Sequence, residues 1–313
     1  MRRRNNKFLR FIYFLLPVLV LLILIISFFA FKKLVSPYDL KLKNGKRLSV
    51  VAAQIKEDLF KKYDITQVNF NTQDGIRLSG YFVKRKWASG NLILAHGYQS
   101  CKEMVSSIID LFPNYNILMF DFRGHGKSEG RFRTLGCLEY KDIFAAVDFL
   151  NDTSASRGFF SRNLPVFILG ISMGGAVAIE ALKRRPDLCN ALVIDSAYAN
   201  LTDVISRSFK AKSGLPSIPF AYVVKKMVNF AADCDIDGVN VIEGINNIKQ
   251  PILFIHACKD KIVDIKDSID MYSCANEKSK ILITPVCEHG YICSTFSDLY
   301  SKKINKFLKK SVA

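Results

Sequence analysis

A serine flanked by glycines is the clearest chemical signal in the chain: Gly170-Ile171-Ser172-Met173-Gly174. It follows the apolar run Val166–Leu169 and precedes an alanine-rich segment, so we expect a strand, a tight turn and a helix. Gly170 and Gly174 would let neighbouring backbone approach without a Cβ clash. At a helix start, amide dipoles favour developing negative charge. We therefore take Ser172 as the candidate nucleophile; the alternative is an ordinary glycine-rich turn with a capping serine.

A serine needs a base to remove its proton, and the chain has four histidines. His289 follows the last apolar run, where a loop returns to the sheet edge that also carries Ser172. We interpret His256, inside an apolar run, as a core residue and His96 as a residue that orients its loop. His125 lies in a glycine-rich loop. His289 is therefore the candidate base.

The base in turn needs a carboxylate that fixes its tautomer and stabilises its cation. Asp260 follows the apolar run Ile252–Ile255 and is the candidate acid, with Asp264 as the alternative. The order along the chain is then Ser172, Asp260, His289, nucleophile before acid before base.

A tetrahedral oxyanion needs backbone N–H donors from two places. The amide of Met173, directly after the nucleophile, is one candidate. The amide of Tyr98 is the other, since Ala95-His96-Gly97-Tyr98 ends an earlier apolar run. This chemistry needs no metal and no organic cofactor, and none of the eight cysteines has the C-x-x-C spacing of a zinc or redox site. Buried free thiols are the expectation, with one or two disulfides as the alternative if the domain faces an oxidising compartment.

Short apolar runs alternate with helical segments after residue 64. The runs are Gln67–Asn71, Arg77–Val83, Leu92–Ala95, Ile117–Phe120, Val166–Leu169, Ala191–Ile194, Ile252–Ile255 and Lys280–Thr284. The helical segments are Val50–Lys62, Leu138–Leu150, Gly174–Arg184 and Ser294–Lys309. The first two runs flank Asp74-Gly75 and predict a hairpin. The rest predict an α/β fold, with a mostly parallel sheet covered by helices on both faces.

One interval breaks this rhythm. Residues 197–250 contain no clear strand but include Pro216, Pro219 and the helix-like stretch Phe220–Ala232. We expect a small lid or cap inserted within one large domain, residues 65–313.

The N-terminal part predicts a membrane anchor. Residues 11–31 are 21 residues without a charge, which as a helix would span roughly 31 Å, close to the thickness of a bilayer core. A basic segment (1–10) precedes them and a connector (32–64) follows. A cleaved signal peptide is the alternative, but the run is long and no small-x-small cleavage site follows it.

The net charge of +17 is concentrated around this segment, because residues 1–47 carry eleven Lys/Arg and one acidic residue. This distribution favours a membrane surface, and no basic motif interleaved with aromatics supports nucleic-acid binding. Five Lys/Arg precede the apolar segment and six follow closely. A short basic N-terminus usually stays in the cytoplasm, so we expect the large domain outside it.

Together these residues resemble the α/β-hydrolase superfamily, and within it single-span Bem46-like serine esterase and peptidase-type hydrolases, over about residues 65–310. The segment Asp121–Gly130 is similar to the D-x-R-G-x-G-x-S loop of that family, which is structural and forms the floor of the site. Two positions depart from the family pattern: Ala257-Cys258 replace a glycine, and Glu288 precedes the candidate base. A carboxylate beside the candidate base would raise the pKa of His289 or compete for its hydrogen bond.

The resemblance implies hydrolysis of an ester-type acyl bond in a small-molecule or lipid-like substrate. Thioester hydrolysis on acylated proteins or lipids, peptide hydrolysis, and a catalytically silent binding module tethered to the membrane are the alternatives.

Overall fold

The structure is a computed structural model that describes residues 2–37, 42, 45–152, 164–285 and 287–312. Eight strands form one sheet in the order β1-β2-β4-β3-β5-β6-β7-β8. They are β1 (Ile65–Asn71), β2 (Arg77–Val83), β3 (Asn91–Ala95), β4 (Asn116–Phe120), β5 (Val166–Ile171), β6 (Ala191–Asp195), β7 (Ile252–Ala257) and β8 (Lys280–Thr284). Strands β1 and β2 form the expected antiparallel hairpin, and β2 pairs antiparallel with β4. The other pairs are parallel, so all the carboxyl ends from β3 to β8 meet at one edge. Each expected strand is confirmed.

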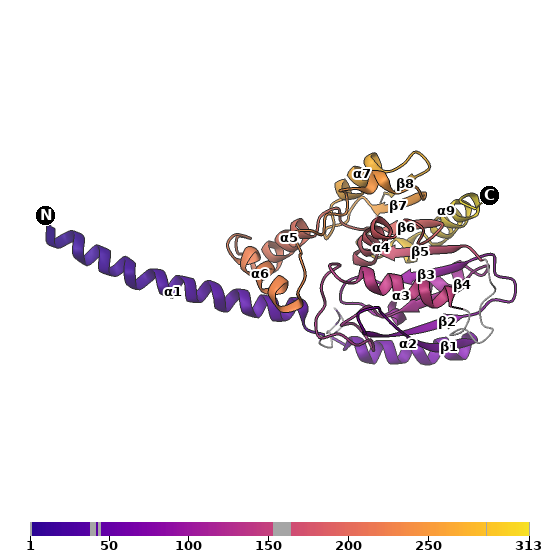
Figure 1. Ribbon diagram of the computed structural model, residues 1–313, viewed down its shortest axis with the longest axis horizontal. Coiled ribbons are helices and arrows are strands. Elements are labelled where there is room, and N and C mark those ends of the chain that lie inside the picture. The colour runs from indigo at the N-terminus through magenta and orange to yellow at the C-terminus, as the bar shows by residue number, and fades with distance from the viewer. Residues whose placement is uncertain (1, 38–41, 43–44, 153–163, 286, 313) are drawn as a thin grey trace.

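Strands β3 to β7 are buried on both faces and are apolar at nearly every position, whereas the edge strands β1 and β8 are only partly buried. In β4, Leu118 and Phe120 join one core while Ile117 and Met119 join the other, as the alternation of strand side chains requires. The first core also receives buried residues of α3 (Tyr140–Asn151) and α4 (Met173–Arg184). The second receives those of α2 (Leu48–Lys62), the 3-10 helix η1 (Lys102–Leu111) and α9 (Ser297–Lys310). Helices thus cover both faces of the sheet (Figure 1).

Several helices differ from the expectation. The expected C-terminal helix is two, α8 (Ile292–Thr295) and α9, separated at Phe296. Helix α7 (Ile265–Cys274) and η1 were not expected, because both are short and mix polar with apolar residues. The interval between β6 and β7 contains α5 (Leu201–Ser213), α6 (Phe220–Ala232) and the short η2 (Ile245–Asn247). Helices α5 and α6 project from the domain beyond the carboxyl edge of the sheet (Figure 1).

Helix α1 (Arg2–Val35) extends away from the body of the protein, with its C-terminal end beside α6 (Figure 1). Among the described residues, one stretch, Tyr13–Val35, is long and apolar enough to cross a membrane by length and composition. Of the expected connector (32–64), residues 32–35 belong to α1 and residues 48–62 form α2, and its positions 38–41 and 43–44 lie outside the described residues. None of the eight cysteines, all of them described, is in a disulfide.

Candidate active site

Ser172 occupies the turn between β5 and α4 with a φ of 54°, in the left-handed region that side chains rarely adopt. The flanking glycines permit this turn. A Cβ on Gly174 would lie 2.2 Å from the carbonyl oxygen of Ala95, and one on Gly170 would lie 2.5 Å from that of Gly174. The backbone N–H of Ser172 donates to the carbonyl of Asp195 at 2.7 Å, which ties the turn to β6. The result is a serine on a rigid, strained turn above the carboxyl edge of the sheet.

The structure brings His289 and Asp260 to this serine. His289 Nε2 lies 3.0 Å from Ser172 Oγ, and His289 Nδ1 lies 2.6 Å from Asp260 Oδ2. The other carboxylate oxygen of Asp260 accepts hydrogen bonds from the backbone N–H groups of Ile262 and Val263, at 2.8 and 2.9 Å. Burial raises the pKa of Asp260, but the bonds from His289 and these two amides outweigh it and hold the pKa below its ordinary value. Asp260 is therefore placed to be ionised and to accept a hydrogen bond from the Nδ1–H group of His289.

The alternative acid, Asp264, lies elsewhere. It caps the N-terminus of α7, where its side chain accepts from the backbone N–H of Lys266 at 3.0 Å, and it is about half exposed. Glu288 is exposed, and both ring nitrogens of His289 already face Asp260 and Ser172. The concern that Glu288 would compete for His289 therefore has no geometric support.

The three other histidines are buried within the protein. His96 Nε2 accepts from the backbone N–H of Phe122 at 3.1 Å, so Nδ1 carries the proton and donates to the carbonyl of Gly97 at 2.7 Å. Burial lowers its pKa, which keeps the ring neutral. His256 is less isolated than expected, because its Nε2 lies 3.5 Å from Asp260 Oδ2. His256 thus packs beside the acid, near the same carboxylate oxygen that the candidate base contacts.

The two candidate oxyanion donors lie close to the serine. Met173 is the first residue of α4, so its N–H has no carbonyl partner within that helix. A Cβ on Gly97 would lie 3.4 Å from the Cβ of Ser172, so the backbone leading into Tyr98 passes beside the nucleophile. The Tyr98 side chain turns away, and its hydroxyl donates to the carbonyl of Leu34 at the end of α1, at 2.6 Å.

Known proteins share this architecture. A family model described as serine aminopeptidase, S33, matches residues 87–215. The α/β hydrolase domain-containing protein WAV2 of Arabidopsis thaliana is 27% identical over 244 residues, which cover 68% of this chain and 70% of WAV2. Protein bem46 of Schizosaccharomyces pombe is 25% identical over 254 residues, covering 78% and 77%. The solved structure of the Pyrococcus furiosus esterase Pf2001 matches with a TM-score of 0.64 at 26% identity, over 79% of this chain and 93% of that chain.

The chain is a member of the α/β-hydrolase superfamily. The expected fold and the resemblance are both confirmed, and the neighbours indicate a hydrolase. The part matched by the family model includes Tyr98, Ser172 and Met173, whereas Asp260 and His289 lie beyond it. The roles of the last two therefore depend on the geometry described above.

A second carboxyl group lies beneath this site and is not predicted from the sequence. Asp195 ends β6, buried beneath the site, and accepts from the hydroxyls of Ser196 and Tyr300 at 2.9 and 3.0 Å. Burial raises its pKa to about 6, although the two hydroxyl bonds and the nearby His289 oppose the rise. An aspartate at the carboxyl end of the strand next to β5 was the available signal, since that position faces the same edge as Ser172.

Replacement of Asp195 by asparagine is expected to change how stability depends on pH. The folded pKa lies above the value of about 3.9 for an unfolded chain, so the folded state holds this proton longer and its stability falls as pH rises through 6. A rise in the pKa of Asp195 from about 3.9 to about 6 corresponds to a change of about 3 kcal/mol in the free energy of unfolding. The free energy of unfolding of the wild type, measured relative to Asp195→Asn, should therefore fall by about 2 kcal/mol between pH 4 and pH 7.5, since part of the full change lies below pH 4. Parallel urea titrations of the two proteins across this range would measure it, and equal slopes with pH would contradict it.

The loop from Asp121 to Gly130 is held by buried ion pairs. Arg123 binds Asp142 through its Nε at 2.8 Å and Asp74 through its two terminal nitrogens at 2.8 and 3.0 Å. Lys102, fully buried, pairs with Asp121. Oxygen and sulfur atoms of Cys101, Glu103 and Asp121 lie within 4.8 Å of one another, as metal ligands could. The Lys102 ammonium already supplies a cation there, 3.5 Å from Glu103, so we interpret this cluster as structural.

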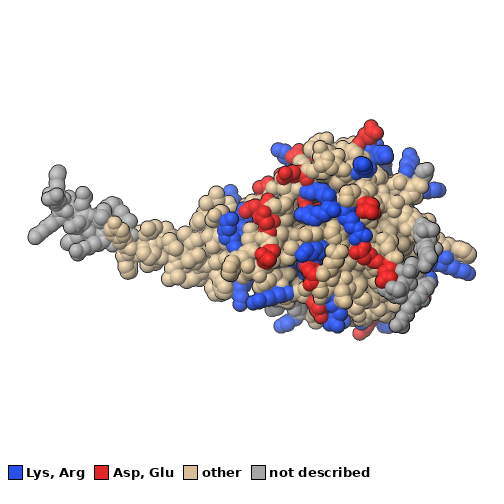
Figure 2. Space-filling view, in the orientation of Figure 1, with Lys and Arg blue, Asp and Glu red and all other residues tan. Residues whose placement is uncertain are grey.

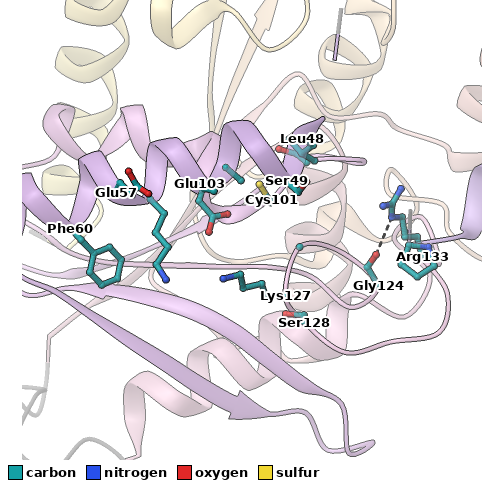
Figure 3. Close-up of a pocket in the computed structure, with 16 residues that line it drawn as sticks. Leu48, Ser49, Glu57, Phe60, Cys101, Glu103, Gly124, Lys127, Ser128 and Arg133 are labelled. Carbon is teal, nitrogen blue, oxygen red and sulfur yellow. Dashed lines mark hydrogen bonds between the residues drawn. The ribbon is translucent and has the colours of Figure 1, made fainter. Parts of the chain in front are cut away.

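A cavity of about 750 Å³ lies between α2 and the loops that follow β3 and β4. Figure 3 shows Phe60 of α2 at one end of it, Lys127 near the middle and Arg133 at the other end, with Arg133 Nε bonded to the Gly124 carbonyl at 3.0 Å. Ser172 and its two partners do not line this cavity. The substrate of the hydrolase is therefore not assigned to it.

Proposed function

We propose that the protein is a serine hydrolase, anchored in a membrane, that cleaves an ester-type acyl bond through an acyl-serine intermediate. The contact chain from Ser172 Oγ through His289 to Asp260, at 3.0 and 2.6 Å, is the observation that carries the proposal. Such a chain lets a neutral imidazole take the serine proton while the carboxylate stabilises the resulting cation.

In the first half of the reaction, Ser172 Oγ attacks the carbonyl carbon of the substrate as its proton moves to His289 Nε2. The negative charge that develops on the carbonyl oxygen is stabilised by the amides of Met173 and Tyr98. The intermediate collapses when the leaving alkoxide takes the proton from Nε2, which leaves an acyl group on Ser172. Asp260 holds the ring in place throughout.

In the second half, water replaces the alcohol. His289 Nε2 removes a proton from a water molecule as its oxygen attacks the acyl carbon. The second tetrahedral intermediate then releases the carboxylic acid, and the proton returns to Ser172 Oγ. Each proton taken by His289 is given back, so no further reactant is consumed.

We further propose that residues 11–31 of α1 span a bilayer, with the hydrolase domain outside the cytoplasm and residues 197–250 as a cap over the site. The length and apolar composition of α1 support the anchor. The projection of α5 and α6 beyond the carboxyl edge supports the cap (Figure 1).

Peptide hydrolysis is the second candidate, because the matching family model is described as a serine aminopeptidase. The two are separated with matched oxoester, thioester and amide substrates of increasing acyl length, assayed with the full-length protein. We expect the highest kcat/KM for oxoesters and a rise with acyl length. Faster cleavage of the amides would favour the peptidase, and hydrolysis of none of the three would favour a silent binding module.

A further inference from the structure

One stripe of α1 is packed against the cap, although most of the helix is exposed. The residues with reduced exposure are spaced by three and one along its C-terminal half: Ile23, Ile26, Ser27, Ala30, Phe31, Leu34 and Val35. This spacing marks a single helix face. Helix α6 contacts α1, and it contributes Ala221, Val224 and Val228 to the same core as Val35. The anchor and the cap are therefore joined by an ordinary helix–helix interface.

The position of this interface along α1 determines how deep α6 lies in the membrane. The uncharged segment of residues 11–31 is just long enough, at roughly 31 Å, to cross the hydrocarbon core. Its last nine residues, 23–31, overlap the stripe that faces α6. If the bilayer ended before Ile23, then Arg10 and Lys7 would have to enter the hydrocarbon, at a cost of about 3 kcal/mol each near its centre. Helix α6 must therefore lie at the level of the leaflet.

The outward surface of the cap suits this position. Ile218 and Phe230 are 78% and 91% exposed, and Tyr222 is more than half exposed. Tyr222, Lys226 and Phe230 follow one another at intervals of four along α6, so they share a face. The Lys226 ammonium lies 5.5 Å from the centre of the Tyr222 ring. Exposed apolar and aromatic side chains with interleaved lysines are typical of helices that lie in a membrane interface near anionic lipids.

A matching pattern appears on α1 at the same level. Phe28 is exposed, and the Lys32 ammonium lies 5.7 Å from its ring. In Figure 2 the described part of α1 that extends from the body shows no Lys, Arg, Asp or Glu, and the first charged side chains appear where it reaches the cap. The uncharged surface of the anchor thus extends as far as the cap, where the first charged side chains begin.

We infer that the cap helix α6 is embedded in the same leaflet as the anchor, with Ile218, Tyr222 and Phe230 in contact with lipid. This inference rests on the proposed membrane anchor. It also connects the bilayer to the site, because the last turn of α1 accepts the hydrogen bond from Tyr98, whose amide is a proposed oxyanion donor.

The chain contains a single tryptophan, which allows a direct test. Trp87 is 82% exposed in the loop before β3, at the amino edge of the sheet and opposite the cap, so it is the matched control for a water-exposed residue. In a Trp87→Phe background, Phe230→Trp reports on the cap and Leu19→Trp, at a half-exposed position of α1, reports on the anchor. Each full-length protein is placed in nanodiscs with plain or brominated phosphatidylcholine, after near-ultraviolet circular dichroism has shown that it is folded.

Brominated lipid should lower the emission of Phe230→Trp and Leu19→Trp by about twofold or more and leave Trp87 unchanged, because quenching requires contact with the acyl chains. Quenching at position 19 without quenching at 230 would overturn the inference and leave the anchor in place. In that case, a blue-shifted emission at 230 would indicate that protein, such as a second copy of the chain, covers the face. Absence of quenching at both positions would overturn the anchor as well.

Discussion

A Ser172→Ala variant is expected to lose on the order of 10⁵- to 10⁶-fold in kcat for ester hydrolysis, because it removes the only atom that forms the acyl bond. KM for a short ester should change little, since the oxyanion amides and the cap remain. Alanine has the same backbone restrictions as serine at a φ of 54°, so the variant should fold with nearly unchanged stability. Initial rates with a p-nitrophenyl ester would measure the loss.

Ser294→Ala provides the matched control for this loss. Ser294 is an exposed serine in α8, a few residues after His289, and its hydroxyl donates to the backbone carbonyl of Tyr291. Its replacement should leave kcat within about threefold of the wild type, as is usual for a surface hydroxyl. Retention of near-wild-type turnover by a folded Ser172→Ala protein would contradict the acyl-serine mechanism.

Replacement of Asp260 by asparagine is expected to lower kcat by about 10⁴-fold while leaving the geometry intact. The backbone N–H groups of Ile262 and Val263 both donate to one carboxylate oxygen, so they should retain the amide oxygen of asparagine. The NH₂ group would then face His289 Nδ1 and donate to it. That tautomer carries its proton on Nε2, which can no longer accept the proton of Ser172.

Asp264→Asn is the control for this prediction, because Asp264 was the competing acid and lies four residues away. It caps α7, and asparagine is an equally good cap, so both stability and kcat should be nearly unchanged. The two variants should be compared by kcat/KM across pH, after both have been shown to be folded. If Asp264→Asn loses activity while Asp260→Asn retains it, Asp264 is the acid and the prediction is wrong.

The sheet could be predicted from sequence because its central strands are buried on both faces. Runs such as Ile117–Phe120 are apolar at every position, and that pattern is uncommon outside a parallel sheet. The positions of Ser172, Asp260 and His289 followed from the same reasoning, since each comes after a strand whose carboxyl end reaches one edge. Chain order and strand direction were therefore enough to bring together groups 29 and 117 residues apart.

Other features depend on tertiary contacts that no local pattern encodes. The raised pKa of Asp195 comes from burial beneath the site, and its exposure could not be inferred from the strand that carries it. His256 was expected in the core, and its proximity to Asp260 arises from the turn that returns Asp260 toward β7. The interface between α1 and α6 joins segments nearly 200 residues apart. Helix α1 is apolar on all sides over residues 11–31, and α6 is amphipathic, so many partners would suit either helix.

The most direct test of the central claim is reaction of the folded, full-length protein with a fluorophosphonate, followed by mass spectrometry of its peptides. The reagent phosphonylates a serine only where a base and oxyanion donors activate it. The account predicts a single adduct on Ser172, and a rate of labelling that falls strongly in His289→Ala. No adduct on the folded wild type, or an adduct on another serine that persists in Ser172→Ala, would contradict it.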